Sequence, residues 1–241
     1  MNGASLAYRI SGLRHQYGDR VVLDVPALEI ARGETLAVIG PSGAGKTTLL
    51  RLLQFLERPT AGRIEYAGAA ALVPVSVEIS RTVTTVFQRS LMLNRSVRNN
   101  VAFGRRLRGG RDAADVDALL ERLALKDLAD APARSLSGGE MQRVALARAI
   151  ATGANVLLLD EPAANLDPRN VAIVETMMKE LQARGVTLVL VTHNTHEARR
   201  LASRTLVLLD GQTIEVGPTS SVFDHPTSPR TRAFLSGELI Y

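Results

Sequence analysis

The chain of 241 residues contains no cysteine. Disulfide bridges, thiolate metal sites and cysteine nucleophiles are therefore excluded, and a reducing compartment is compatible with the sequence. No apolar run reaches the length of a transmembrane helix, and the N-terminal segment MNGASLAYRI lacks the apolar region of a secretory signal. Internal repeats and low-complexity segments are also missing. We expect a soluble protein that is not exported by a cleaved signal.

The composition is that of an ordinary globular protein, with 46% hydrophobic and 22% charged residues. This length suits one α/β domain with a large core. The net charge of +5 admits nucleic acid or an anionic membrane surface as a partner. However, the densest cationic cluster, Arg105-Arg106-Leu107-Arg108 with Arg111, has no interleaved aromatic residues. A solvated or membrane-facing surface is the better interpretation, and no nucleic acid is expected.

The most informative stretch begins with the apolar run Leu36–Ile39, which predicts a buried strand. The run leads directly into a segment of the form G-x-x-x-x-G-K-[ST]. The residues of this segment, with the threonine that follows it, are Gly40, Pro41, Ser42, Gly43, Ala44, Gly45, Lys46, Thr47 and Thr48. Five leucines on one side then predict a helix, namely Leu49, Leu50, Leu52, Leu53 and Leu56.

This spacing suits a loop that wraps around a polyphosphate. Glycines let the backbone adopt positive φ angles and turn its N–H groups inward, and the helix that starts near Lys46 points its positive end at the same anion. Lys46 can reach the β- and γ-phosphates, and the Thr47 hydroxyl can ligate Mg²⁺. Among chains of this length, on the order of one in a hundred would contain such a match by chance. The strand and helix on either side lower those odds further.

Other segments show the patterns of regular structure. Val156–Leu159 and Thr187–Thr192 are continuous apolar or β-branched runs, which predict strands buried on both faces. Further strands are expected over 6–14, 21–30, 63–66, 82–87 and 205–209, with a hairpin turn at Asp210-Gly211 after the last of them. Helices are expected over 112–125, whose apolar residues share one face, over 168–183 and 197–202, and directly after the run 136–140. The pattern of 68–80 predicts no definite element. The composition shift from 91 to 131 indicates a helical insert.

Chemistry-bearing side chains stand at the ends of these segments. Asp160 and Glu161 follow a buried strand, where open α/β sheets place their ligands. His193 follows the next strand; by itself such a histidine is more often structural or solvated. The run Leu136-Ser137-Gly138-Gly139-Glu140 leads into a helix and predicts a second anion-binding helix terminus. Tyr17, taken alone, reads as a half-buried aromatic at a strand end.

With these pieces in this order, the chain resembles the ATP-binding cassette (ABC) ATPases over nearly all of its length. The run LSGGE at 136–140, followed by Met141-Gln142-Arg143, is the specific feature because it is similar to the family signature. The resemblance implies an α/β fold: a P-loop NTPase core with an antiparallel β subdomain and an inserted α-helical subdomain. The expected division of the single domain 1–241 is a nucleotide-binding core of 1–87 and 136–241 and a helical subdomain of 88–135.

The resemblance also implies a role for each matching residue. Tyr17 matches the aromatic that stacks on adenine, and Gly40 to Thr47 match the Walker A loop. Gln88 matches the glutamine that senses Mg²⁺ and the γ-phosphate and couples to the membrane partner. Asp160 matches the aspartate that holds Mg²⁺.

The remaining matches complete the implied site. Glu161 matches the catalytic glutamate that polarises water, and His193 matches the histidine that contacts the γ-phosphate. Ala164 to Asp167 match the D-loop. In the family, two copies sandwich ATP between the Walker A loop of one and the LSGGE segment of the other.

Three positions depart from the family pattern: Glu140 replaces the more usual glutamine, Ala164 a frequent serine, and Asn194 a frequent aspartate. Ala164 lacks the serine hydroxyl to which the resemblance assigns one hydrogen bond across the dimer. None of the three removes a catalytic group.

The implied function is an ATPase subunit at the cytoplasmic face of the membrane. It would form a homodimer with ATP, drive a membrane permease, and receive solute indirectly from an extracytoplasmic binding protein. Residues 88–97 and 231–241 look like tungstate-type importers, so an oxyanion, tungstate first, is the expected cargo. The alternatives are another importer (phosphate, molybdate or amino acid), an exporter, or a soluble ABC ATPase acting on nucleic acid or ribosomes.

Overall fold

The computed structural model describes residues 5–106 and 113–238. Its centre is a ten-stranded sheet in the order β5-β4-β1-β2-β10-β9-β3-β8-β7-β6. The strands are β1 (Leu6–Tyr17), β2 (Arg20–Ala31), β3 (Thr35–Ile39), β4 (Ala61–Tyr66), β5 (Ala69–Ala70), β6 (Val83–Val86), β7 (Val156–Asp160), β8 (Thr187–Thr192), β9 (Arg204–Leu209) and β10 (Gln212–Pro218). All the strands expected from the sequence are present, with small shifts at their ends.

The parallel half of the sheet contains β9, β3, β8, β7 and β6. Every residue of β3, β7 and β8 is buried, as their unbroken apolar runs predict. Because these strands run in the same direction, Ile39, Asp160 and Thr192 end at one edge of the sheet. This edge receives the phosphate loop, the acidic pair and the histidine. β10 then folds back on β9 through the turn Asp210-Gly211, confirming the hairpin expected there.

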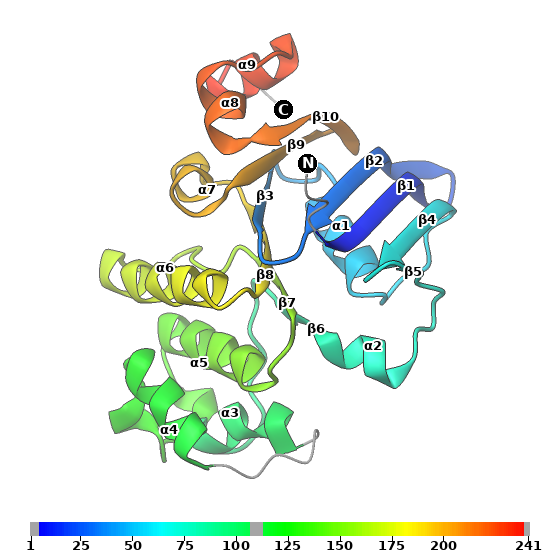
Figure 1. Cartoon of the computed structure of the whole chain (residues 1–241). Helices are drawn as coiled ribbons and strands as arrows, with labels where there is room; N and C mark the ends of the chain where they lie inside the picture. The colour runs from blue at the N-terminus through cyan, green and yellow to red at the C-terminus, as the bar shows by residue number, and fades with distance from the viewer. Residues whose placement is uncertain (1–4, 107–112, 239–241) are drawn as a thin grey trace.

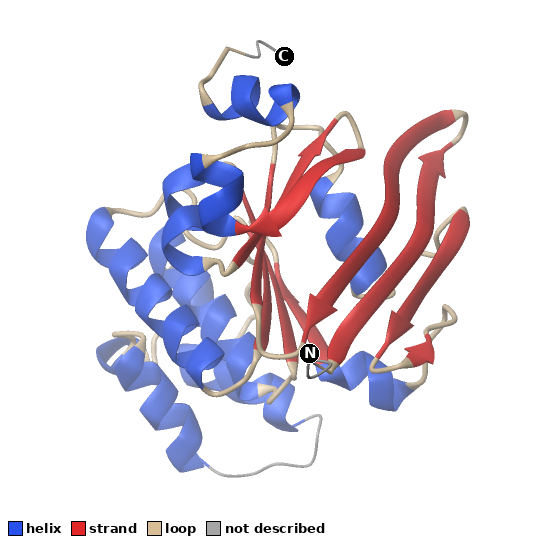
Figure 2. Ribbon diagram, turned by 45° about the horizontal axis from the view of Figure 1, so that its top comes forward, coloured by secondary structure: helices blue, strands red, loops and turns tan. Residues whose placement is uncertain are grey.

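The antiparallel half consists of β1, β2, β4 and β5. Figure 2 shows the long strands of this half standing apart from the helical side of the molecule, with a helix in the space between. That position belongs to α1, whose Leu49 and Leu53 share one apolar core with Leu13 of β1, Leu23 of β2 and Val38 of β3. The same core therefore fixes the phosphate loop against both halves of the sheet.

The helices cover both faces of the parallel half (Figure 1). They are α1 (Lys46–Leu53), α2 (Val77–Thr82), α3 (Val97–Arg106), α4 (Ala113–Arg122), α5 (Gly138–Ala151), α6 (Pro168–Ala183), α7 (Thr195–Leu201), α8 (Thr219–Asp224) and α9 (Pro229–Leu235). No helix within 5–106 and 113–238 is long and apolar enough to cross a membrane.

The end of α1 corrects one prediction. Leu56 was expected on the apolar side of this helix, but the helix ends at Leu53 and Leu56 is 56% exposed. Phe55 adopts a φ of 62°, which is left-handed and cannot continue an α-helix. The ring of Phe55 is buried instead, against Tyr8 and Tyr66.

The segment between β6 and α5 carries α3 and α4, which pack against α5 at the lower end of Figure 1. The apolar face expected for α4 is confirmed, because Val116, Leu119, Leu120 and Leu123 are all buried in one core with α5 and α6. Leu107, Arg108 and Arg111 of the cationic cluster, and Asp112 at the expected start of α4, lie outside the described residues.

The stretch 68–80, for which the sequence predicts no element, holds β5 and the start of α2. Ser76 caps α2 by accepting a hydrogen bond from the N–H of Ile79 at 3.4 Å. None of the six residues of α2 is buried, so no apolar periodicity marks it in the sequence.

Candidate active site

The phosphate loop is held close to neighbouring backbone. A Cβ atom on Gly40 would lie 2.0 Å from the carbonyl oxygen of Leu208, and one on Gly45 would lie 2.6 Å from that of Val22. Gly45 also has a φ of 95°, which favours glycine. These two positions therefore need glycine for steric as well as conformational reasons.

The first turn of α1 is open to an anion. Its N-cap is Gly45, which offers no side-chain acceptor, and the turn holds no acidic residue. The first backbone N–H groups of a helix have no partner within the helix, and the helix dipole adds partial positive charge at this end. The loop and the first turn of α1 together thus present backbone N–H donors that suit a phosphate group.

Lys46 extends back over the loop. Its Nζ donates to the carbonyl oxygens of Gly40 and Pro41 at 2.7 and 2.8 Å. Burial lowers the pKa of the ammonium group, and the carboxylates of Glu161 and Asp160 partly offset that effect. The charge is therefore held in place by groups of its own loop and can exchange these carbonyl contacts for phosphate oxygens.

Asp160, at the end of β7, accepts a hydrogen bond from the hydroxyl of Thr47 at 3.0 Å. Burial raises the pKa of the Asp160 carboxyl group, while the Thr47 hydrogen bond and the charge of Lys46 lower it. A carboxylate that is costly to keep charged in the interior gains from a nearby cation. The hydroxyl oxygen of Thr47 and the carboxylate oxygen of Asp160 are hard ligands of the kind that Mg²⁺ takes.

Glu161 is fixed from three directions. Its backbone has a φ of 49°, an unusual value for a non-glycine residue, and its N–H donates to the carbonyl oxygen of Val191 at 2.9 Å. Its Oε2 accepts a hydrogen bond from Gln88 Nε2 at 2.9 Å, and its Oε1 lies 2.9 Å from His193 Nδ1. Strained backbone of this kind clusters at functional sites.

A cavity of about 360 Å³ unites these groups. It is lined by Arg20, Val22, Ser42, Gly43, Gly45, Lys46, Thr47, Thr48, Gln88, Asp160 and Glu161. Arg20 and Val22 come from β2, and the sequence interpretation missed both because they belong to no motif. A second cavity, of about 560 Å³, continues past Gln88, Glu161 and His193 to the D-loop residues Ala164 and Asn165.

Tyr17 does not line either cavity. Its hydroxyl donates to Glu57 Oε2 at 2.6 Å, its ring meets His15 edge-on, and the residue is 47% exposed. Tyr17 is thus a half-exposed aromatic residue at the end of β1.

The signature segment leads into α5, and none of Leu136, Ser137, Gly138, Gly139 and Glu140 lines the two cavities. Ser137 is the N-cap of α5 and Glu140 completes a capping box with it. In the D-loop, Asp167 is the N-cap of α6 and accepts from the N–H groups of Arg169 and Asn170. Both ends are exposed, so another chain could reach them.

A further residue that the sequence interpretation missed supports His193. Glu197 is 4% exposed, and its Oε2 accepts a hydrogen bond from the hydroxyl of Thr192 at 2.6 Å. The same hydroxyl accepts from the N–H of Asn194 at 3.0 Å. Thr192 and Asn194, the residues on either side of His193, are therefore joined by a hydrogen bond. Burial raises the pKa of the Glu197 carboxyl group.

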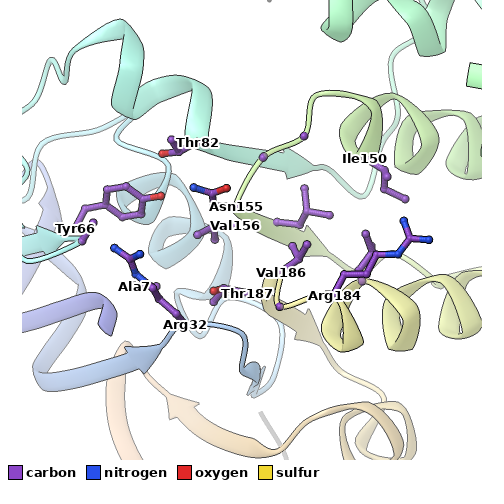
Figure 3. A pocket seen from close by; sticks show the side chains of 16 residues that line it. Ala7, Arg32, Tyr66, Thr82, Ile150, Asn155, Val156, Arg184, Val186 and Thr187 are labelled. Atoms are coloured by element: carbon purple, nitrogen blue, oxygen red, sulfur yellow. The ribbon is translucent and has the colours of Figure 1, made fainter. Parts of the chain in front are cut away.

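Another cavity, of about 590 Å³, lies at the opposite edge of the sheet, where β7 and β8 begin at Val156 and Thr187. Figure 3 shows Arg32 and Tyr66 toward one end, Asn155 between the ends, and Arg184 toward the other. It contains none of the motif residues, so cavity size alone would misplace the active site.

The phosphate loop, the buried strand that ends in two carboxylates, and the cavity between them define a P-loop nucleotide-binding protein. The model of the ABC transporter family matches residues 23–164, more than half of the chain. The chain belongs to this family, whose members are ATPases.

Curated relatives agree over almost the whole length. "Phosphate import ATP-binding protein PstB 2" of Natronomonas pharaonis is 43% identical, with 99% of this chain and 90% of the relative covered. A "probable anion import ATP-binding protein" of Haloferax volcanii is 42% identical, covering 95% and 86%. "Tungstate uptake system ATP-binding protein TupC" of Peptoclostridium acidaminophilum is 38% identical, covering 84% and 94%.

Among solved structures, cbiO1 of Clostridium perfringens, described as part of an ABC transporter complex, superposes with a TM-score of 0.81 at 26% identity. The match covers 98% of this chain and 100% of that one. The expected α/β ABC ATPase fold is thereby confirmed.

Proposed function

We propose that this chain is the ATP-hydrolysing subunit of a membrane importer. The observation that carries the proposal is the position of Glu161, whose two carboxylate oxygens are held by Gln88 and His193 beside the phosphate loop. A carboxylate held in this way can accept a proton from a water molecule aligned with the γ-phosphate. Phosphoryl transfer depends mainly on such positioning and on charge stabilisation.

Each residue of the cavity then has a role. Lys46 and the backbone N–H groups of 42–48 bind the phosphates, and Thr47, Asp160 and Gln88 would supply oxygen ligands for Mg²⁺. When bound, the ion would neutralise charge on the phosphate oxygens. His193 reaches the γ-phosphate and keeps Glu161 oriented, and Gln88 links the site to the segment that follows it. Tyr17 stacks on the adenine ring.

The site is completed by a second copy of the chain. Ser137 and Asp167 lie on exposed helix ends and away from the cavity that holds Lys46. Two chains packed head-to-tail would bring the signature segment of each onto the nucleotide of the other. ATP favours this paired state and hydrolysis releases it, which is a population shift driven by the ligand. In this scheme 1–87 and 136–241 form the nucleotide-binding core, and 88–135 form the helical subdomain that meets the permease.

Import of an oxyanion is the transport activity that we infer. Relatives that align with most of this chain carry phosphate import, anion import and tungstate uptake in their names. A permease would carry the solute across the membrane, with an extracytoplasmic binding protein delivering it and this chain on the cytoplasmic face. Tungstate remains the cargo indicated by residues 88–97 and 231–241, and phosphate is the alternative favoured by overall identity.

The variant Glu161→Gln tests the catalytic assignment. It keeps the size and hydrogen bonds of the side chain but cannot take a proton, so ATP hydrolysis should fall by about 10²–10⁴-fold while ATP still binds. With hydrolysis blocked, a dimer should persist on size exclusion with ATP and Mg²⁺. Glu121→Gln, an exposed glutamate of α4, is the matched control and should behave as the unsubstituted chain. A Glu161→Gln protein that hydrolyses ATP normally would refute the assignment.

The cargo is tested by uptake in cells that carry either the unsubstituted gene or the Glu161→Gln variant. We expect tungstate accumulation to stop in the variant cells and phosphate accumulation to continue. Loss of phosphate uptake alone would assign phosphate instead, and unchanged uptake of both would reject oxyanion import.

A further inference from the structure

The N-termini of α1 and α5 are both rich in glycine, but they are capped differently. The first turn of α1 contains no acidic residue and no side-chain cap. The first turn of α5 contains Glu140, which closes a capping box with Ser137. Anions are favoured at both ends by the helix dipole, but only at α5 does the chain supply an anion of its own.

The contacts show how far Glu140 occupies this end of the helix. Its Oε2 accepts hydrogen bonds from the backbone N–H of Ser137 at 2.8 Å and from the hydroxyl of Ser137 at 2.7 Å. The Ser137 hydroxyl in turn accepts from the N–H of Glu140 at 3.4 Å. Both donors of Ser137 are therefore directed at a carboxylate of the same chain.

The charge on this carboxylate is maintained. The side-chain and backbone hydrogen bonds from Ser137 lower the pKa of Glu140, with a smaller contribution from the charge of Arg143. Glu140 therefore remains ionised at neutral pH. A phosphate that approaches Ser137 meets a negative charge where it needs a donor.

We propose that Glu140 is an internal competitor of the partner's nucleotide, so that its carboxylate sets the ATP concentration at which two chains pair. The proposal rests on the two-chain sandwich proposed above. For the γ-phosphate to take the Ser137 hydroxyl, the Glu140 carboxylate must give up this hydrogen bond and tolerate a second anion nearby. Glu140 is thus a positioning residue that acts through Ser137.

A comparison of Glu161→Gln with the double variant Glu161→Gln/Glu140→Gln tests this. Glutamine keeps an acceptor for Ser137 and removes the charge. The ATP concentration for half-maximal dimer, measured by light scattering with Mg²⁺, should fall about five-fold in the double variant. Glu161→Gln/Glu121→Gln removes an equal charge from α4 and should leave the midpoint unchanged.

Two further readouts separate competition from a structural role. Binding of a fluorescent ATP analogue to the monomer should be the same in all three proteins, because the phosphate loop is untouched. The difference between the midpoints should shrink as salt is raised from about 0.05 to about 0.5 M, because salt screens exposed charges. If the Glu140→Gln double variant does not fold, Glu140→Ala replaces it, with the same expected direction.

Equal midpoints with and without the Glu140→Gln change, or a higher midpoint in the double variant that carries it, would overturn the competitor role and leave the two-chain sandwich intact. Absence of any ATP-dependent dimer in all three proteins would overturn the sandwich itself, and this inference with it.

Discussion

The hydroxyl of Thr47 donates to Oδ2 of Asp160 at 3.0 Å, joining residues that are 113 positions apart in the chain. Thr47 comes from the first turn of α1 and Asp160 from the last position of β7. The contact brings the phosphate loop and the acidic pair to one place.

Asp160→Asn should have opposite effects on nucleotide binding and on stability. Burial raises the pKa of Asp160, so its charge opposes folding when no cation is present. We expect the nucleotide-free variant to melt at a higher temperature at neutral pH and to lose Mg²⁺-dependent nucleotide binding. Calorimetry and a fluorescent ATP analogue measure the two effects.

The sign of the stability effect depends on pH. A carboxyl group whose pKa is raised in the folded state favours folding when protonated, so the cost appears only as pH rises from the unfolded value through the folded one. The gain from Asp160→Asn should therefore be present at pH 7 and absent well below the unfolded pKa of about 3.9. A gain that is the same at both pH values would indicate another origin.

Lys46→Ala should abolish useful ATP binding. The ammonium group is buried and held by the carbonyl oxygens of Gly40 and Pro41, so it is already placed at the phosphate loop. Equilibrium titration with a fluorescent ATP analogue is the measurement, and near-unchanged affinity would remove Lys46 from the role proposed. Lys126→Ala, at an exposed position in the helical region, is a suitable control.

Gly40→Ala and Gly43→Ala should differ in stability although both lie in the same loop. A Cβ at Gly40 would collide with the carbonyl oxygen of Leu208, which a rigid strand holds, so we expect a loss of about 3 kcal/mol. Gly43 has open space and a φ of 79°, so only the left-handed backbone opposes alanine, at about 1 kcal/mol. Urea unfolding of the two variants gives the comparison. Equal losses would show that the close approach does not matter.

Tyr17→Phe should preserve nucleotide binding and Tyr17→Ala should weaken it, because stacking requires a ring face and not a hydroxyl. The structure adds that the phenylalanine variant loses the hydrogen bond to Glu57. If nucleotide affinity falls equally in both variants, this hydrogen bond matters and the stacking role is wrong. A titration at fixed Mg²⁺ distinguishes the two cases.

Much of the fold follows from local patterns in the sequence. The buried strands Leu36–Ile39 and Val156–Leu159 were predicted because a strand covered on both faces has no polar position to interrupt its apolar run. The helix after Lys46 and the face of α4 followed from their leucine spacing. The prediction that Leu56 lies on the apolar side of α1 was wrong, because the left-handed turn at Phe55 that ends the helix leaves no apolar spacing in the sequence.

The chemistry of the site was also accessible from the sequence in part. The spacing of Gly40, Gly45 and Lys46 specifies a phosphate loop because only glycine readily adopts the backbone angles and close contacts that this loop requires. The roles assigned to Gln88, Glu161 and His193 came from family resemblance, and they stay predictions.

Tertiary structure alone decided how those residues meet. Gln88, Glu161 and His193 follow three different strands, and only the parallel order β8-β7-β6 puts the side chains of Gln88 and His193 within hydrogen-bond distance of Glu161. No sequence pattern marks Arg20 in the cavity or Glu197 behind Thr192, since neither belongs to a local motif. Contacts between distant segments depend on strand order and packing, whereas a sequence motif records only the backbone and chemistry of its own segment.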